Sequence, residues 1–262
     1  MTVVSPLHLF DLRDKTILIT GASGALGTEA ARALTTAGAH VVLAGGNADA
    51  LEKLACELPE DQVATVHRRP DSPADAEAMV ARTVEAFGRL DGVLASAGVN
   101  KVAPIVDMPV ADFETVMDAN VRGAWLTCQA VGRRLLAQGE GGSVVLVSST
   151  RGRLGHPAGY SAYCPSKAAV DLLAKSLAAE WGKDGIRVNA LAPTVFRSEL
   201  TAWMYADDAK GSATRDAMLS RIPLGRLAEP DDFSGALIYL LSDASAFLTG
   251  QVLYLDGGYT SC

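Results

Sequence analysis

Tyr163 and Lys167 are the two residues whose types and spacing best suit acid–base chemistry in this sequence. They lie in the stretch "YSAYCPSK", residues 160–167. Side chains four positions apart on a helix project from the same face, which would place the lysine ammonium one turn from the phenol. A phenol has an ordinary pKa of about 10, and a nearby ammonium or a hydrogen bond to the phenolate lowers it. The pair therefore predicts proton transfer at a substrate oxygen, as the conversion of an alcohol into a carbonyl requires.

Two neighbours in the same stretch are weaker candidates for this role. Four positions after Tyr160 stands Cys164, so Tyr160 has no ammonium partner at helical spacing. Cys164 points elsewhere round the helix and has no evident histidine partner, so we do not expect a catalytic thiol. We expect Tyr160 to line a substrate pocket. For Tyr163 and Lys167, the alternative interpretation is an ordinary surface pair, and the motifs described below weigh against it.

Composition and charge exclude several classes of protein. The 262 residues are 49% hydrophobic and 20% charged, which is enough apolar material for a buried core. The net charge of −7 argues against a nucleic-acid partner. We find no apolar run long enough for a membrane span, no signal peptide and no metal-ligand spacing. The cysteines read as free thiols and favour a cytoplasmic location; they are Cys56, Cys128, Cys164 and Cys262.

Short β-rich runs alternate with helical stretches along the chain. The expected strands are 15–20, 40–44, 62–67, 91–96, 143–148, 186–191 and 251–255. The expected helices include 25–37, 72–87, 111–138 and 165–182. Most strands are nearly continuous in Val, Ile and Leu, which is typical of a parallel sheet covered on both faces. The pattern predicts an α/β fold, a single doubly wound parallel sheet of about seven strands with helices on both faces, in one domain over residues 1–262.

One segment breaks this alternation. From Glu199 to Arg221 the sequence is long, polar and contains Gly and Ser. We interpret residues 194–221 as an excursion on the substrate side rather than part of the core. Its residues Trp203, Met204 and Tyr205 could close over a substrate and exclude water.

A glycine-rich turn follows the first expected strand. In "KTILITGASGALG", Gly21, Gly24 and Gly27 lie between that strand and the first expected helix. Glycine permits a tight turn and lets backbone N–H groups approach a pyrophosphate at the helix N-terminus. A plain strand-to-helix turn is the alternative. The position at the head of a strand–helix–strand unit favours dinucleotide binding.

The turn and six further motifs together resemble the short-chain dehydrogenase/reductase family. In chain order they are "TGASGALG", "ASAG" (95–98), "DAN" ending at Asn120, "VSS" ending at Ser149, Tyr163-x-x-x-Lys167, "NALAPT" (189–194) and "TGQVLYLDGG" (249–258). The resemblance covers nearly the whole chain. It implies a Rossmann-type sheet, a nicotinamide cofactor and hydride transfer to or from carbon. Ala25 departs from the family pattern, where a second glycine belongs.

The resemblance also assigns roles to individual residues. It implies that Ser149 orients the carbonyl, Tyr163 transfers the proton, Lys167 lowers the pKa of Tyr163 and holds the nicotinamide ribose, and Asn120 supports a proton relay at a helix kink. The interval from Ser149 to Tyr163 is one residue longer than is common in the family, so Ser148 stays open as an alternative to Ser149. The cofactor-binding residues it implies are Gly21, Ser23, Gly24, Leu26, Gly27, Gly46, Asn47, Arg69, Ala97, Gly98, Tyr163, Lys167, Pro193 and Val195.

The choice between NAD and NADP depends on the end of the second expected strand. A carboxylate there would bind the ribose 2′-OH of NAD, and an arginine would accept the 2′-phosphate of NADP. This chain has Gly45, Gly46 and Asn47 instead, followed after the third strand by Arg68 and Arg69. We predict an NAD(P) cofactor and favour NADP. The alternative is that both arginines are solvated charges at a strand end.

Cationic residues follow two strands that should border the active-site mouth. "STRGRLGHPAGY" contains Arg151, Arg153 and His156, and "APTVFRSEL" contains Arg197. Arginines at one rim could recognise a carboxylate, phosphate or sulfonate, so we predict an anionic or polyhydroxylated substrate such as a sugar, sugar acid or hydroxy acid. Salt bridges within the fold or between subunits are the alternative for these arginines.

Two other functions stay open at this point. One is a reductase of 3-ketoacyl thioesters, and the other is a non-catalytic nucleotide-sensing protein on the same fold. The resemblance further implies a homotetramer in which the helices at 111–138 and 165–182 pair between subunits and the C-terminal "DGGYTSC" lies near another interface.

Overall fold

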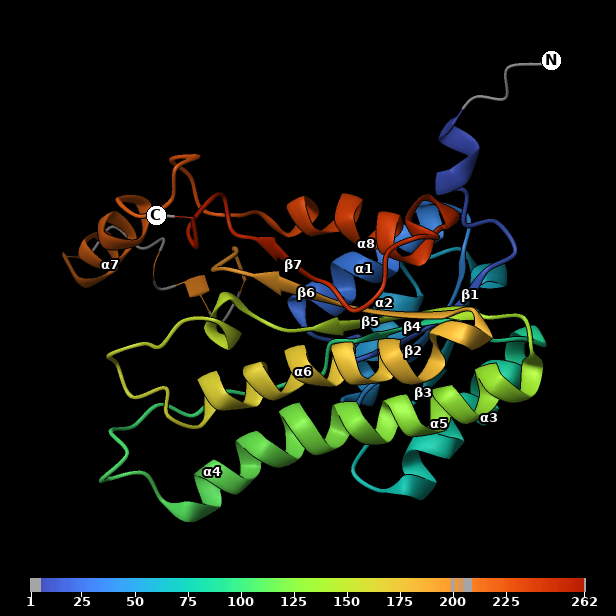
Figure 1. Ribbon diagram of the computed structural model, residues 1–262, viewed down its shortest axis with the longest axis horizontal. Helices are drawn as coiled ribbons and strands as arrows, with labels where there is room; N and C mark the ends of the chain where they lie inside the picture. The colour runs from blue at the N-terminus through green and yellow to red at the C-terminus, as the bar shows by residue number, and fades with distance from the viewer. Residues whose placement is uncertain (1–5, 199–200, 203, 205–208, 262) are drawn as a thin grey trace.

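A parallel β-sheet organises the chain. The computed structural model describes residues 6–198, 201–202, 204 and 209–261, and within them the chain forms a seven-stranded parallel sheet in the order β3-β2-β1-β4-β5-β6-β7 (Figure 1). The predicted doubly wound sheet is therefore confirmed. The strands are β1 Thr16–Thr20, β2 His40–Ala44, β3 Val63–Val66, β4 Gly92–Ala95, β5 Gly142–Val147, β6 Ile186–Pro193 and β7 Val252–Leu255.

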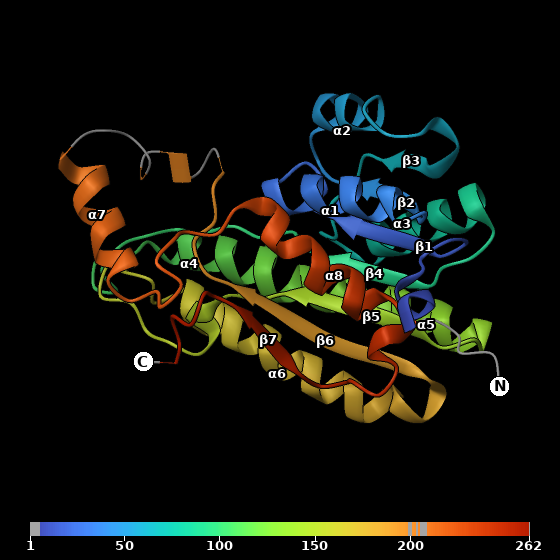
Figure 2. The same ribbon diagram turned by 90° about the horizontal axis from the view of Figure 1, so that it is seen from above.

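Helices cover both faces of this sheet (Figure 2). One face carries α3 Pro73–Phe87, α5 Gly123–Gln138 and α6 Tyr163–Trp181, with α4 Val110–Met117 leading into α5. The other face carries α1 Ala25–Thr36, α2 Ala48–Ala55 and α8 Ser234–Leu241. The short helices are η1 Pro6–Phe10, η2 Glu60–Gln62, η4 Thr150–Gly152, η5 Gly182–Asp184, η7 Pro230–Phe233 and η8 Asp243–Ser245.

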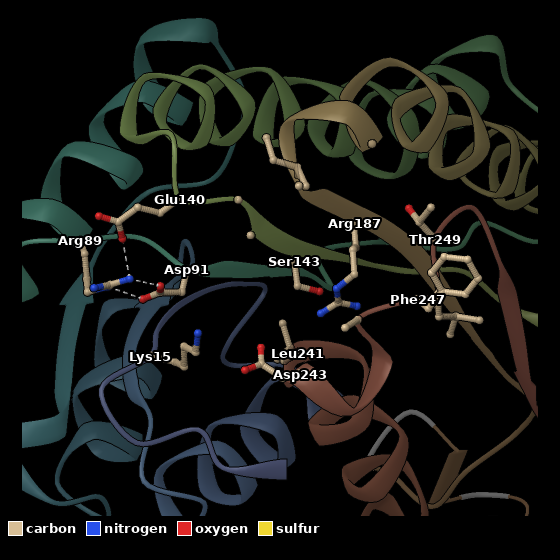
Figure 3. A pocket seen from close by; sticks show the side chains of 17 residues that line it. Lys15, Arg89, Asp91, Glu140, Ser143, Arg187, Leu241, Asp243, Phe247 and Thr249 are labelled. Carbon is tan, nitrogen blue, oxygen red and sulfur yellow. Dashed lines mark hydrogen bonds and ion pairs between the residues drawn. The ribbon is translucent and has the colours of Figure 1, made fainter. Parts of the chain in front are cut away.

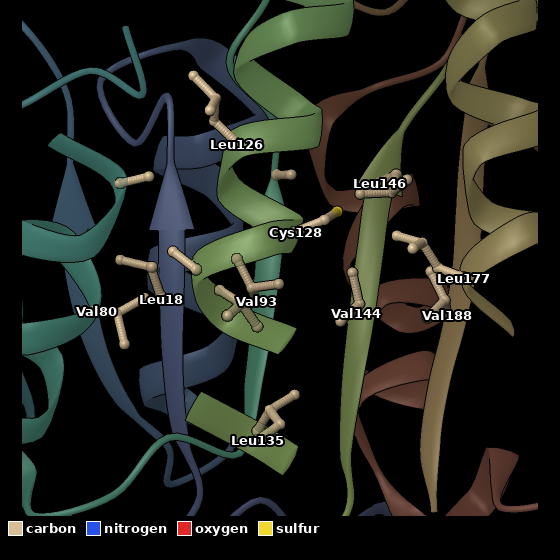
Figure 4. Close-up of a cluster of buried hydrophobic side chains, with 14 of the residues drawn as sticks. Leu18, Val80, Val93, Leu126, Cys128, Leu135, Val144, Leu146, Leu177 and Val188 are labelled. Carbon is tan, nitrogen blue, oxygen red and sulfur yellow. The ribbon is translucent and has the colours of Figure 1, made fainter. Parts of the chain in front are cut away.

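Each layer of helices buries its own apolar core against the sheet. On the α3, α5 and α6 side, Leu18, Val93 and Val144 pack with Leu135 and Leu177 (Figure 4). A separate cluster fills the α1, α2 and α8 side. Strands that pack on both faces must be apolar on both sides, which explains their unbroken Val, Ile and Leu runs. No helix in the described part of the chain is long and apolar enough to span a membrane.

The register of the strands creates a shared edge for ligands. Thr20 at the end of β1 pairs with Ala44 on one side and Ala95 on the other. The chain proceeds outward in opposite directions from β1 and β4, so the crossover helices leave a crevice between these two ends. The Ser96 hydroxyl donates to the carbonyl oxygen of Thr20 at 2.6 Å and joins the two ends there.

The helix expected over residues 111–138 is interrupted in the structure. A π-helical turn, η3 Asp118–Arg122, separates α4 from α5. Its residue Asn120 is 1% exposed. A π-turn inserts one extra residue per turn and frequently marks a functional site. The kink that the family resemblance implied at Asn120 is therefore present as a break in the regular hydrogen-bond ladder.

Helix α6 begins two residues earlier than expected, at Tyr163 rather than at Pro165. The earlier start is compatible with Pro165, because the N–H groups of the first helical turn have no partner within the helix and proline loses nothing there. Tyr163 and Lys167 consequently both lie inside the helix, one turn apart.

The predicted excursion forms its own small substructure beside the sheet. Helix α7 Ala209–Leu219 stands apart from the main layers near the C-terminus (Figure 1). Behind it, Ile222 and Leu227 pack against Tyr259 in a separate cluster. Met204 is buried. Trp203 and Tyr205, the other two residues expected to close over a substrate, lie outside the described residues, as do Glu199 and Cys262.

Candidate active site

Four residues implied by the family resemblance meet at the carboxyl edge of the sheet. Ser149 follows β5, Tyr163 and Lys167 open α6, and Asn120 lies in the π-turn. Helix α6 packs directly on β6, β5 and η4, which fixes its first two turns against the end of β5. The topology thus brings together side chains from three separate segments of the chain.

Ser149, not Ser148, faces the phenol. The Ser149 side chain hydrogen-bonds with Tyr163. Ser148 points the other way, because its hydroxyl donates to the Lys167 carbonyl oxygen at 3.3 Å and interacts with Asp171. Successive side chains of an extended segment point to opposite faces, so only one of the two serines can reach the site. Of the two serines, Ser149 is the one in contact with Tyr163, and the prediction that it faces the substrate is carried forward.

Lys167 is buried with its ammonium group inside the site. Its Nζ donates to the carbonyl oxygen of Val147 at 2.9 Å and lies 5.7 Å from the centre of the Tyr163 ring. Burial lowers the pKa of Lys167 to about 8, although the charge of Asp171 opposes that effect. Asp171, one turn further along α6, is itself buried, and burial raises its pKa.

Asn120 ties the π-turn to two neighbours. Its Oδ1 accepts from the Val99 N–H at 2.8 Å, and its Nδ2 donates to the Val99 carbonyl and the Ser166 hydroxyl, both at 2.9 Å. Ser166 in turn donates to the carbonyl oxygen of Tyr163 at 2.7 Å. This chain of hydrogen bonds connects the kink in one helix with the first turn of α6.

The net shift in the pKa of Tyr163 is upward, and the expectation that Lys167 lowers this pKa stays a prediction. Burial raises the pKa of Tyr163 above its ordinary value, and this effect exceeds the lowering by the Ser149 hydrogen bond and the charge of Arg151. A buried phenol keeps its proton because the phenolate would lose hydration. In the described arrangement Tyr163 is therefore a neutral phenol that can donate a proton.

The glycine turn between β1 and α1 leaves a space that side chains at its glycine positions would fill. Gly21 has a φ of +69°, and a Cβ atom there would lie 2.7 Å from the backbone of Ala97. A Cβ atom on Gly27 would collide with the carbonyl oxygen of Gly21. Gly24 caps α1 without any side-chain hydrogen bond. The first N–H groups of α1 thus face a compact glycine turn, an arrangement that suits a pyrophosphate.

Gly98 lies between two of the polar residues. A Cβ atom there would be 3.0 Å from Asn120 Oδ1 and 3.5 Å from Lys167 Nζ. The other implied cofactor residues border the same edge: Ser23 and Leu26 in the turn and first helix, Ala97 after β4, and Pro193 and Val195 at the end of β6. These residues fit a dinucleotide that extends across the carboxyl ends of β1 and β4.

Arg69 lies over the end of β2. A Cβ atom on Gly46 would collide with Arg69 Nε and lie 3.0 Å from its Cζ. None of the described carboxylates pairs with Arg69, whereas Arg68 pairs with Asp75 at 2.8 Å. Asn47 caps α2 by accepting from the Ala50 N–H at 3.1 Å. One arginine therefore lies beside the end of β2, where NAD and NADP are distinguished, although it comes from the loop after β3.

The predicted substrate arginines have partners within the chain. Arg197 Nε donates to the Glu229 carboxylate at 3.1 Å. For Arg197 the structure thus shows a salt bridge within the fold, which was the alternative to substrate binding. The Arg153 guanidinium lies 5.6 Å from the centre of the Tyr254 ring. Arg151 is buried and donates to the Gly155 carbonyl and the Tyr259 hydroxyl, both at 3.2 Å.

An aromatic series lies next to the phenol. The rings of His156 and Tyr160 are 4.4 Å apart, and Tyr160 meets Tyr163 edge to face at 6.0 Å. Burial lowers the pKa of His156, and the charges of Arg151 and Arg221 lower it further. The prediction that Tyr160 lines the substrate pocket is compatible with this position.

Two residues of this region were missed by the sequence reasoning. Tyr259 is 1% exposed, and the guanidinium of Arg221 lies 4.2 Å from the centre of its ring. Tyr259 packs inside its own chain, and the expectation that the C-terminal segment lies near a subunit interface stays a prediction. No periodic pattern surrounds Tyr259, so only the fold reveals that it reaches Arg151.

A cavity of about 520 Å³ lies at the opposite, amino-terminal edge of the sheet (Figure 3). Lys15, Asp91 and Arg187 line it. The Arg187 guanidinium donates to the Ser245 hydroxyl and to the carbonyl oxygens of Leu240 and Ser242, so it caps the end of α8. Over the described ranges, no cluster of His, Cys, Asp or Glu could hold a metal ion.

Known oxidoreductases resemble this chain in sequence and in fold. A family model described as enoyl-(acyl carrier protein) reductase matches residues 21–260. An uncharacterized oxidoreductase of Mycobacterium tuberculosis is 68% identical, over 98% of this chain and 95% of its own. A D-threitol dehydrogenase of Mycolicibacterium smegmatis is 38% identical, over 96% and 95%. The crystal structure of a gluconate 5-dehydrogenase from Burkholderia cenocepacia, in complex with NADP and tartrate, is 32% identical with a TM-score of 0.91 and covers 98% of this chain and 100% of that one.

Proposed function

This chain belongs to the short-chain dehydrogenase/reductase family, and from that premise we propose that it interconverts a secondary alcohol and a ketone on a polyhydroxylated substrate, with NADP as the preferred cofactor and Tyr163 as the general acid/base. A nicotinamide cofactor supplies the hydride acceptor or donor at carbon when it is bound. The residues of this chain handle the proton at the substrate oxygen.

Tyr163 moves that proton. In the reduction of a ketone, the neutral phenol donates its proton to the developing alkoxide, and burial, which raises the pKa of the phenol, keeps the proton on it until then. In the oxidation of an alcohol, the same oxygen must accept the proton as a phenolate. The Ser149 hydroxyl, which hydrogen-bonds with Tyr163, would hold the substrate oxygen at the same time.

Lys167 and Asn120 prepare the phenol for this task. The ammonium of Lys167, 5.7 Å from the ring centre, stabilises the phenolate, and its contact with the Val147 carbonyl fixes its position. Asn120 holds the first turn of α6 through Ser166. Gly98 leaves room beside both side chains, because a Cβ atom there would crowd Asn120 Oδ1 at 3.0 Å and touch Lys167 Nζ at 3.5 Å.

The preference for NADP rests on Arg69. Its guanidinium lies against Gly46 at the end of β2 and has no carboxylate partner among the described residues. A guanidinium binds a phosphate through paired hydrogen bonds, so Arg69 would accept the 2′-phosphate. We expect Arg69→Ala to raise the KM for NADP about tenfold and leave that for NAD nearly unchanged. Arg68→Ala is the matched control, because Arg68 pairs with Asp75.

The substrate class follows from chemistry at the site and from the relatives. The site has hydroxyl, phenol and guanidinium donors in Ser149, Tyr160 and Arg151, which suit an oxygen-rich molecule. The similar proteins named above act on a polyol and on a sugar acid. Reduction of a 3-ketoacyl thioester is the second candidate, supported by the acyl-carrier description of the matching family model.

The observation that carries this proposal is the meeting of Tyr163, Ser149 and Lys167 at the carboxyl edge of the sheet. The test is a panel of polyols, sugar acids, hydroxy acids and 3-ketoacyl thioesters, run in both directions with both cofactors. We expect turnover of polyhydroxylated substrates, and a loss of at least about a thousandfold in kcat for Tyr163→Phe. Tyr239→Phe, on the far face of the sheet, is the control. Near-full turnover by Tyr163→Phe would refute the assignment, and failure of both cofactors to bind would favour a non-catalytic role.

We also propose a homotetramer in the cytoplasm. Several large apolar side chains on the outer surface of α4, α5 and α6 are exposed, which supports pairing between subunits; they include Val110, Phe113, Trp125, Leu136 and Leu172. Light scattering of the purified protein tests the assembly. The free thiols of Cys56, Cys128 and Cys164 support a reducing compartment.

A further inference from the structure

Asp171 is a buried carboxylate to which the proposed chemistry gives no task. It lies on α6, one turn after Lys167, and its exposed fraction is 9%. Among the described residues its Oδ1 has no hydrogen-bond partner. A buried polar atom without a partner lowers the free energy of unfolding, so an apolar side chain at this position would serve stability better. The presence of a carboxylate here therefore calls for a reason other than stability.

One oxygen of this carboxylate packs against the turn that follows Ser149. A Cβ atom on Gly152, the last residue of η4, would collide with Asp171 Oδ2. The same Cβ atom would lie 3.1 Å from the carbonyl carbon and oxygen of Lys167. The η4 turn thus lies directly against α6 at Lys167 and at Asp171, and glycine at position 152 leaves the room that the carboxylate occupies.

The residue before Ser149 meets the same part of α6. The Ser148 hydroxyl donates to the Lys167 carbonyl oxygen at 3.3 Å, and its side chain interacts with Asp171. Ser148 is 2% exposed, so these contacts lie inside the fold. One carboxylate on α6 therefore contacts the chain on both sides of Ser149, at positions 148 and 152.

Hydrogen bonds within the turn connect these contacts to the Ser149 side chain. The Gly152 N–H donates to the Ser149 carbonyl oxygen at 2.9 Å, and the Arg151 N–H donates to the Ser149 hydroxyl at 3.2 Å. The same hydroxyl hydrogen-bonds with Tyr163. A movement of Gly152 away from α6 would therefore displace both the backbone and the hydroxyl of Ser149 relative to the phenol.

We propose that Asp171 is a positioning residue whose carboxylate holds the η4 turn against α6 and thereby fixes the Ser149 hydroxyl relative to the Tyr163 phenol. This role rests on the proposed function, in which Ser149 holds the substrate oxygen while Tyr163 moves the proton. Asp171 acts through Ser149 in this role and makes no contact with the reacting atoms. Its loss affects the chemical step, because a small displacement of a group that orients the substrate reduces the rate strongly.

An electrostatic role is the alternative for Asp171. Burial raises the pKa of this carboxyl most, and the charges of Lys175 and Lys167, each one turn away on α6, lower it. An electrostatic role requires the negative charge, whereas positioning requires only a side chain of the same shape. With a polyol as substrate, we expect Asp171→Ala to lower kcat about tenfold and to leave the KM for the cofactor nearly unchanged. Asp171→Asn keeps the shape and should recover most of the activity, with an unchanged pH profile of kcat/KM.

A double-mutant cycle with Ser149→Ala tests whether Asp171 acts through Ser149. Once the Ser149 hydroxyl is gone, removal of Asp171 has no positioned group left to disturb. We therefore expect Asp171→Ala to lower kcat about tenfold in the native protein but less than about twofold in the Ser149→Ala background. Gly152→Ala, whose Cβ atom would displace the carboxylate, should behave in the same way. Glu180→Ala, exposed on the same helix, is the control for loss of an acidic residue.

Three outcomes would overturn the proposal. One is a kcat for Asp171→Ala within about twofold of the native value. Another is a pair of losses that multiply in the Asp171→Ala, Ser149→Ala double variant, which would show that the carboxylate acts elsewhere. The third is a loss in Asp171→Asn as large as in Asp171→Ala, which would favour the electrostatic role. If Asp171→Ala fails to fold, Gly152→Ala in both backgrounds provides the same cycle. Turnover by Tyr163→Phe would instead refute the proposed function itself, so the two failures are distinguishable.

Discussion

The side chain of Arg69 occupies the space that a Cβ atom on Gly46 would need. This contact joins the loop after β3 to the loop after β2, and it is possible only because residue 46 is glycine. The atoms that a Cβ would meet belong to the end of a flexible side chain, so a larger residue at position 46 would displace Arg69 rather than disrupt the sheet.

We therefore expect Gly46→Ala to fold normally but to lose the proposed preference for NADP. The KM for NADP should rise about threefold to tenfold, because the displaced guanidinium no longer reaches the 2′-phosphate. The KM for NAD should change little. Gly45→Ala is the matched control, since a Cβ atom there makes only ordinary contacts of 3.5 Å with Leu51. Equal losses for both cofactors in Gly46→Ala would contradict this role of Arg69.

The two adjacent serines should differ in their effect on turnover. Ser149→Ala removes the hydroxyl that hydrogen-bonds with Tyr163 and accepts from the Arg151 N–H, so we expect kcat to fall about a hundredfold and the free energy of unfolding to fall by about 1 kcal/mol. Ser148→Ala removes a hydrogen bond to the Lys167 carbonyl and should lower the free energy of unfolding by about 1 kcal/mol while kcat stays within about threefold. Steady-state kinetics and urea unfolding of both variants measure this. The reverse pattern would show that Ser148 faces the substrate.

Lys167 should reduce stability at neutral pH. Burial lowers its pKa from 10.5 to about 8, so the unfolded chain binds the proton more tightly than the folded one. This difference in pKa lowers the free energy of unfolding by up to about 3 kcal/mol below pH 8. The loss declines as the pH rises from about 8 to 10.5 and vanishes above that range. Lys167→Met removes the cost but leaves the Val147 carbonyl without its donor.

We expect Lys167→Met to be about 1–2 kcal/mol more stable than the native protein at pH 7 and to lose most of its activity. The stability advantage should shrink between pH 8 and pH 10.5. Urea unfolding at several pH values measures both effects. Lys175→Met, on the same helix, is the control for loss of a lysine. A native protein that is more stable than Lys167→Met at pH 7 would show that the ammonium contributes net stability.

Local patterns in the sequence determined most of the fold. Apolar runs defined the strands, and the alternation of strands with helices defined the doubly wound sheet, because both depend on side-chain periodicity within a few residues. The glycine turn and the spacing of Tyr163 and Lys167 are likewise local. The predicted ends of the helices were less accurate than the predicted strands. Helix α6 starts at Tyr163 rather than at Pro165, and this start is possible because the first turn of a helix tolerates proline.

Only the tertiary structure decided how distant segments meet. Gly46 and Arg69 follow different strands, and the parallel pairing of β2 with β3 brings them into contact. Arg151 and Tyr259 are 108 positions apart and share a hydrogen bond. They meet because β7 pairs with β6 beside β5, so that the segment after β7 lies near the turn after β5. The neutral state of Tyr163 also depends on burial, which no single motif specifies. The sequence by itself therefore determined which residues are candidates for the chemistry, and the packing of remote segments decided their electrostatic surroundings.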